Sequence, residues 1–167
     1  MPTLELRTLI DAPLERVFDL ARDVDLHAAS MQGYAERPIA GVVSGLIGPG
    51  QSVTWQATHF GVAFRLTSRI TAFSAPRHFR DEMVDGPFKR LVHDHLFEPA
   101  GAGTLMRDVF AYEAPWAGLG RLADRLFLRR HMLRLLSERN AAIKILFENK
   151  PGQQRGKYTF EIKQQRS

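Results

Sequence analysis

The stretch RLVHDHLFEPAGAGTLMRDVF, residues 90–110, decides the fold of this chain. Its two halves alternate apolar and polar residues, and PAGAG at 99–103 lies between them. Alternating segments around a short loop with glycine are typical of a β-hairpin. His93 and His95 stand two residues apart, which places both imidazoles on the same face of one strand. The stretch therefore predicts a hairpin that carries two histidines side by side.

The pairing of this hairpin brings an aspartate to the histidines. Pairing of Phe97 with Met106 is the first of two possible registers. It puts Asp108 opposite His95, and a shift by two residues puts Asp108 opposite His93 instead. In both registers one face of the hairpin carries Leu91, His93, His95, Phe97, Met106, Asp108, Phe110 and Tyr112. Because this is the more apolar face, we expect it to point into the core.

Alternating polarity and turn residues predict further strands around the hairpin. The expected strands span residues 3–10, 34–44, 52–60, 62–73, 78–84, 88–98 and 104–113. Short loops between the later strands favour an antiparallel meander. Apolar spacing predicts two short helices at 11–24 and 25–33, the first capped by Asp11, and one long helix from 119 to about 149. Arg129 and Asn140 occupy two places in the apolar stripe of the long helix.

This order of elements predicts an α+β fold. A curved antiparallel sheet of about six to seven strands wraps around the long C-terminal helix, and two short helices follow the first strand. Strand twist accumulates across a sheet of this size, so the sheet cannot stay flat. A curled sheet around one amphipathic helix buries both apolar faces and leaves a gap where helix and sheet part. Small ligands bind in gaps of this kind.

The composition fits one globular domain and excludes several classes of protein. The chain has 167 residues, of which 44% are apolar and 25% charged, and a domain is usually about 100–200 residues long. Cysteine is absent, which excludes disulfides, thiolate metal sites and a cysteine nucleophile. No apolar run reaches the roughly 18 residues of a membrane span, and MPTLELRTLI lacks the features of a secretion signal. We therefore expect no transmembrane segment and a cytoplasmic location.

The positive charge is concentrated at the C-terminal end. Residues 150–167 contain five basic residues and one acidic residue, which gives +4 of the total net charge of +5. The high pI therefore reflects this tail, and no nucleic-acid partner is predicted. We expect residues 1–149 to form a ligand-binding domain and residues 150–167 a basic tail, either disordered or forming an added strand. The sequence specifies no oligomeric state.

Several segments resemble one known family. They are IDAPLERVFDLARDV at 10–24, VTWQATHFG at 53–61, ITAFSAPRHFRDEMVDGPFKRLVHDHLFEPAGAGTLMRDVFAYEAP at 70–115 and LGRLADRLFLRR at 119–130. In this order, over residues 1 to about 149, they are similar to the START-like helix-grip proteins of the SRPBCC superfamily. Within it they resemble the polyketide cyclase/dehydrase-type and coenzyme-Q-binding-type START domains. The resemblance implies a helix-grip fold with a hydrophobic cavity for a lipid, an isoprenoid such as a quinone, or a polyketide, and it fixes no reaction.

The candidate ligand-binding residues lie on the inward faces of the predicted strands. Trp55 is in phase with Val53, and Asp81 is in phase with Phe79, so each pair shares one face of its strand. Together with the hairpin they form the predicted site: Trp55, Phe79, Asp81, Leu91, His93, His95, Met106, Asp108, Phe110 and Tyr112.

Three roles are open for His93, His95 and Asp108. A zinc site needs three or four ligands, and the spacing adds none to these three, so no metal ion and no cofactor are predicted. A hydrogen bond between histidine and aspartate suits general acid–base chemistry on a polyketide or another keto substrate. A hydrogen-bonded cluster that lines the cavity, or rests in the core, is the simplest interpretation.

The sequence therefore favours a protein that binds a hydrophobic or amphipathic small molecule, as a carrier or binding protein. A cyclase-like or dehydratase-like enzyme that uses the cluster is the first alternative, and a regulator of a protein partner is the second. RLADRLFLRRHMLR at 121–134 also allows a transient membrane contact. The loop around Gly48 is either a gate at the cavity mouth or an ordinary connection.

Overall fold

The structure, a computed structural model, describes residues 1–114 and 127–148. The expected basic tail and the expected first part of the long helix, residues 119–126, lie outside the described residues. The elements follow in the order β1 Thr3–Ile10, α1 Leu14–Ala21, α2 Val24–Ser30, a 3-10 turn Gln32–Tyr34, β2 Arg37–Gly41, β3 Ser52–His59, β4 Val62–Ser74, β5 His78–Asp85, β6 Arg90–Ala100, β7 Gly103–Glu113 and α4 Arg129–Glu148.

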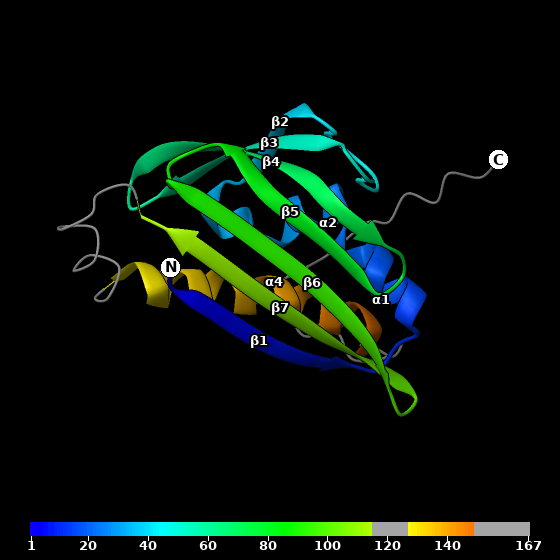
Figure 1. Cartoon of the computed structure of the whole chain (residues 1–167). Helices are drawn as coiled ribbons and strands as arrows, with labels where there is room; N and C mark the ends of the chain where they lie inside the picture. Colours follow the sequence, from blue (N-terminus) through cyan, green and yellow to red (C-terminus); the bar gives the residue numbers. More distant parts are fainter. Residues whose placement is uncertain (115–126, 149–167) are drawn as a thin grey trace.

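In the described part of the chain, seven strands form one antiparallel sheet that curves around α4 (Figure 1). Their order is β1-β7-β6-β5-β4-β3-β2. Strands β2 to β7 follow one another as a meander, and β1 pairs with the last strand, β7. The two short helices therefore lie in the connection between opposite edges of the sheet. This arrangement confirms the predicted α+β fold, with β2 at an edge as Pro38 indicated.

The hairpin of β6 and β7 has the first of the two predicted registers. In it, Asp108 of β7 lies opposite His95 of β6. Strand β5 pairs with the other side of β6 and sets Asp81 opposite His93 and Phe79 opposite His95. Strand pairing alone therefore brings two carboxylates and two imidazoles together from three neighbouring strands.

The helices depart from the prediction in two places. Pro13 is the N-cap of α1 and no described side chain caps it, so the expected cap by Asp11 is wrong, because the proline comes between that residue and the helix. Helix α2 is capped by Asp23, whose carboxylate accepts a hydrogen bond from the backbone N–H three residues on. In α4, Asn140 is buried as expected, whereas Arg129 is exposed in the first turn, where its charge stays in water.

An aromatic cluster fixes α1 against the sheet. Phe18 makes edge-to-face contacts with Phe73, Phe79 and Phe97, with ring centroids 5.4–5.6 Å apart. Such pairs contribute about 0.5–1.5 kcal/mol beyond the area that they bury. The cluster closes the core at the end of the sheet where α1 lies.

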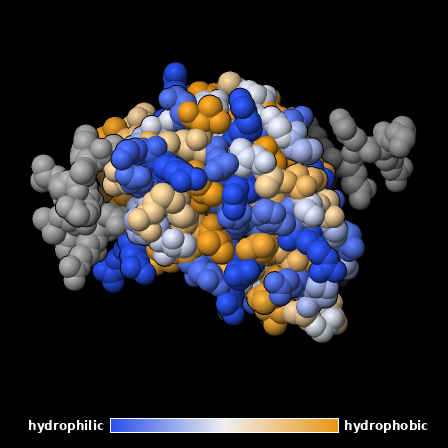
Figure 2. All heavy atoms as spheres, viewed as in Figure 1, coloured by the Kyte–Doolittle hydropathy of each residue, from blue (hydrophilic) through white to orange (hydrophobic). Residues whose placement is uncertain are grey.

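The outer face of the sheet mixes hydrophilic and hydrophobic side chains (Figure 2). Asp94 belongs to this face because it alternates with the inward-facing histidines of β6. Its carboxylate accepts hydrogen bonds from Arg80 at 2.8 and 2.9 Å and contacts His78 Nε2 at 2.7 Å. None of the described helices is long and apolar enough to cross a bilayer.

We expect Gly103→Ala to destabilise the protein by about 1–3 kcal/mol. Gly103 begins β7, and a Cβ atom there would overlap the carbonyl group of Ile10 at the end of β1. The two backbones would have to separate. Gly33→Ala is the matched control, since no described atom lies within 4 Å of its Cβ position. Urea unfolding measures both variants, and equal free energies of unfolding would contradict the close approach of β1 and β7.

Candidate functional site

A cavity of about 360 Å³ lies between the inner face of the sheet and helices α2 and α4. Ligand pockets commonly measure about 300–1,000 Å³, so this one has room for a small organic molecule. Its wall is mostly apolar. Its larger apolar side chains include Val53, Trp55, Phe64, Leu66, Ile70, Phe79, Phe88, Leu91, Phe110, Met132 and Leu136.

Seven of the ten predicted site residues line this cavity: Trp55, Phe79, Asp81, Leu91, His93, His95 and Phe110. The other three, Met106, Asp108 and Tyr112, belong to β7, are 0% exposed and do not reach the described wall. Strand β7 lies beside β1. Helix α4 packs directly on β1. The helix fills the space above this part of the sheet, so these three residues support the wall instead of forming it.

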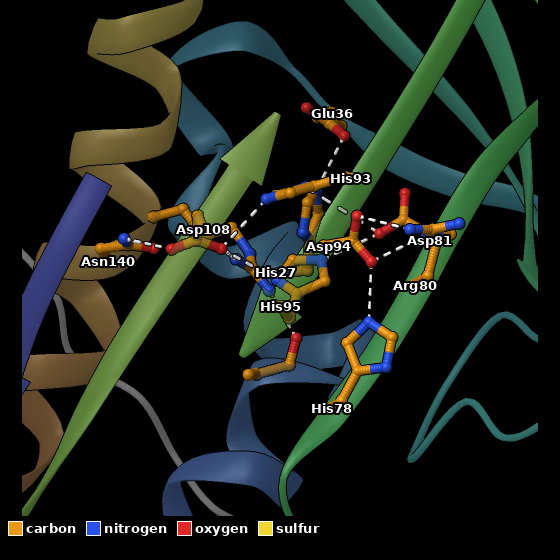
Figure 3. Close-up of polar contacts among 12 residues, drawn as sticks. His27, Glu36, His78, Arg80, Asp81, His93, Asp94, His95, Asp108 and Asn140 are labelled. Atoms are coloured by element: carbon orange, nitrogen blue, oxygen red, sulfur yellow. Dashed lines mark hydrogen bonds and ion pairs between the residues drawn. The ribbon is translucent and has the colours of Figure 1, made fainter. Parts of the chain in front are cut away.

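Asp108 is the centre of a buried polar cluster (Figure 3). Its Oδ1 lies 3.0 Å from His93 Nε2 and 2.9 Å from His95 Nδ1. The first contact is a hydrogen bond; in the second, the ring nitrogen is close but not aimed along a hydrogen-bond direction. From α4, Asn140 Nδ2 donates to Asp108 Oδ2 at 2.7 Å. One carboxylate therefore lies against both imidazoles, binds one of them and joins the sheet to the helix.

Asp81 faces the same histidines from the opposite side. Its Oδ2 lies 2.9 Å from His95 Nε2 and 3.9 Å from His93 Nδ1. The two imidazole rings are 3.7 Å apart, and the ring of His95 stacks on Phe79 at 4.1 Å. Each imidazole has one nitrogen near Asp108 and the other near Asp81 (Figure 3).

Helix α4 contributes a buried arginine that the sequence analysis missed. Arg139 is 6% exposed and lines the cavity. Its Nη2 donates to the carbonyl group of Ala21, and its Nη1 lies 3.5 Å from Asp108 Oδ1 without a hydrogen bond among the described residues. The spacing of the helix could have identified it. Arg139 lies three residues after the buried Leu136 and four before the buried Ile143, which places all three on one face of α4.

Burial and close contacts set the charges of the cluster. Burial alone would raise the pKa of Asp108, but its interactions with His93 and His95 outweigh burial and hold that pKa well below its usual range. Burial would also raise the pKa of Asp81, yet its hydrogen bond with His95, together with the charge of Arg139, lowers it. Burial lowers the pKa of His93. At neutral pH two ionised carboxylates therefore face a neutral His93.

A second polar group lies on the α2 and β3 side of the cavity. His27 Nε2 is 2.9 Å from Glu36 Oε1, and the His27 ring lies tilted against Trp55 with the ring centroids 4.4 Å apart. His131 Nε2 is 3.1 Å from His59 Nδ1, and burial lowers the pKa of both rings. Of these residues only Trp55 is predicted from the sequence, since no strand or helix period links it to the others.

A family model described as polyketide cyclase / dehydrase and lipid transport matches residues 1–148. The chain belongs to this family. No curated protein matches the chain in sequence.

Solved structures share the fold of this polyketide cyclase-type chain. A protein from Thermus thermophilus is 22% identical with a TM-score of 0.68, over 85% of this chain and 97% of that one. A protein from Mycobacterium smegmatis is 20% identical with a TM-score of 0.63, over 86% and 89%. Ginseng major latex-like protein 151 from Panax ginseng is 16% identical with a TM-score of 0.63, over 89% and 98%. Together with the family match, these structures identify a helix-grip fold of the kind that binds hydrophobic ligands.

We expect Asp108→Asn to destabilise the protein by about 3 kcal/mol, as when one partner of a buried ion pair is removed. The groups around this carboxylate are donors or cations from His93, Arg139 and Asn140. Asparagine replaces one of the two acceptor oxygens by a donor and removes the negative charge, so the arginine loses its counter-charge.

Asp94→Asn is the control for this prediction. Asp94 also contacts a histidine and an arginine, but on the outer face of the sheet, where solvent screens the charges and ion pairs typically contribute about 1 kcal/mol. Thermal and urea unfolding of the two variants compare the two sites. Equal losses of stability would contradict the central position of Asp108.

Proposed function

We propose that this protein binds a hydrophobic or amphipathic small molecule in its cavity and acts as a carrier or binding protein. The ligand classes that suit the cavity are lipids, isoprenoids such as quinones, and polyketides. The observation that carries the proposal is an apolar cavity of about 360 Å³ that meets a compact polar cluster. In such pockets the apolar wall supplies affinity and the few polar groups orient the ligand.

The size of the apolar contribution explains why the polar groups matter. Burial contributes about 25 cal/mol per Å², so a ligand that buries about 300 Å² gains roughly 7 kcal/mol before the costs of association. A micromolar complex needs about 8 kcal/mol after those costs. Hydrogen bonds from the ligand to Asp81, His93 or His95 are one available source of the remainder.

Ala57→Phe is expected to weaken ligand binding by roughly tenfold or more, equivalent to ~1.4 kcal/mol. Ala57 is buried in β3 and lines the cavity, so a phenyl ring would occupy ligand volume. Gln56→Phe is the control, because the neighbouring side chain points to the other face of β3. The measurement is the ligand-induced rise in melting temperature over a panel of quinones, fatty acids and aromatic polyketides. A panel that shifts neither the wild-type protein nor the control contradicts the proposal.

A cyclase-like or dehydratase-like activity is the second candidate, and the hydrogen bond between His93 and Asp108 favours it. Asp108 engages Nε2 of His93 and leaves Nδ1 on the side of Asp81. A neutral imidazole oriented in this way can accept a proton from a keto substrate.

His93→Phe tests this second candidate, because phenylalanine keeps a flat ring but has no nitrogen. Turnover of a polyketide substrate should be lost in this variant, while the affinity for a purely apolar ligand stays at the wild-type value. Persisting turnover would remove His93 from the chemistry, and a matching loss of affinity would assign it to ligand binding alone.

A further inference from the structure

The polar cluster has the donor set of a metal centre. One ligand atom from each of Asp81, His93 and His95 lies within 4.8 Å of the other two. Two imidazoles and one carboxylate suit zinc and the neighbouring divalent transition metals. The sequence alone predicted no metal, since it grouped the histidines with Asp108. The pairing of β5 with β6 supplies Asp81 as the third ligand on the opposite side of the rings.

We propose that Asp81, His93 and His95 bind one divalent transition-metal ion of the zinc class, with an open coordination position toward the cavity. Three protein ligands and one open position are the arrangement of catalytic zinc sites, whereas structural sites use four protein ligands. The Asp81 side chain lines the cavity and is 21% exposed, which gives an ion a route in.

Asp108 completes this site from behind. It contacts His93 Nε2 and His95 Nδ1 at 3.0 and 2.9 Å, which leaves His93 Nδ1 and His95 Nε2 for the ion. A metal-bound histidine usually donates its other N–H to a carboxylate or carbonyl group, which fixes the tautomer and the ring. Asn140 donates in turn to Asp108, so the supporting carboxylate is itself held in place.

The spacing of the donors fits an ion after small side-chain shifts. In a tetrahedral site with zinc bonds of about 2.0–2.2 Å, ligand atoms lie roughly 3.3 Å apart. Here Asp81 Oδ2 lies 2.9 Å from His95 Nε2 and 3.9 Å from His93 Nδ1. The two distances bracket the ideal value.

The charge of the cluster also favours a cation. Imidazoles that bind a metal are neutral, so in the metal-bound cluster the two aspartates face one buried guanidinium, that of Arg139, and their negative charge is in excess. Buried charge is costly unless it is paired. A dication between Asp81 and the two histidines compensates this excess.

Metal binding does not rest on the proposed carrier function and is measured without any apolar ligand. The full-length protein, free of any affinity tag and treated with a chelator, is titrated with Zn²⁺ by calorimetry and with Co²⁺ by visible absorption. We expect one ion per chain, the intense visible bands of four- or five-coordinate cobalt, and a higher melting temperature with metal.

Variants of the ligands should lose this binding. Asp81→Asn, His93→Phe and His95→Phe are expected to abolish the cobalt bands, and Asp108→Asn to weaken binding by about 10–100-fold. Circular dichroism of each variant checks that it is folded. Asp81→Asn is the decisive variant, because its side chain is partly exposed and the amide keeps an oxygen acceptor for His95.

His59→Phe and His78→Phe are the matched controls and should bind metal like the wild-type protein. His59 pairs with His131 on another part of the cavity wall, and His78 pairs with Asp94 on the outer face. Loss of cobalt binding in His59→Phe with retention in Asp81→Asn would overturn the proposal and move the ion to the other histidine pair. Absence of stoichiometric binding by the folded wild-type protein would overturn it as well. Apolar ligand binding by metal-free protein is a separate measurement, so either result leaves the carrier proposal to its own test.

Discussion

The Asp108 carboxylate is held between strand β6 and helix α4, by His93 on one side and Asn140 on the other. Burying an ionised carboxylate costs several kcal/mol of hydration free energy unless hydrogen-bond donors of the protein replace the lost waters. Because these donors come from different elements, the helix cannot slide or rotate on the sheet without exposing the charge to an apolar surrounding. The same interaction therefore fixes the position of α4 and, with it, the shape of the cavity. Arg139 strengthens this connection, since it lies next to Asp108 and also binds the end of α1 through Ala21.

Much of the fold follows from the two-residue period of strands. That period placed Leu91, His93 and His95 on one face, and the PAGAG loop restricted the hairpin to two registers. The structure has the first of these registers, with His95 opposite Asp108. The edge position of β2 followed from Pro38, which cannot donate to a neighbouring strand.

Whether an inward-facing side chain reaches the cavity or is covered by a helix could not be predicted in the same way. A strand period tells which face a side chain occupies, but not what covers that face. Phe110 and Tyr112 share a face of β7, yet only Phe110 reaches the cavity, because α4 closes the space near β1. Contacts across the cavity could not be predicted from the sequence either. His59 and His131 are 72 residues apart in sequence, and they meet only because of the path that α4 takes across the sheet. A charged residue such as Arg139 is usually on the surface, so its place on the buried face of the helix was not recognised from the spacing.

The position of the cluster on paired strands has a consequence for the kind of ligand that the cavity accepts. Side chains on β5 and β6 are held by the sheet and cannot turn away as loop residues can. A ligand that is apolar throughout would cut the partly exposed Asp81 carboxylate off from solvent without offering it a donor, and an unpaired buried polar group costs about 1–3 kcal/mol. Sites built from fixed polar groups reject ligands that lack the matching group more strongly than an apolar wall rejects a ligand of the wrong length. For the proposed ligand we therefore expect the apolar wall to limit its size and the cluster to select a molecule with a polar atom at one end.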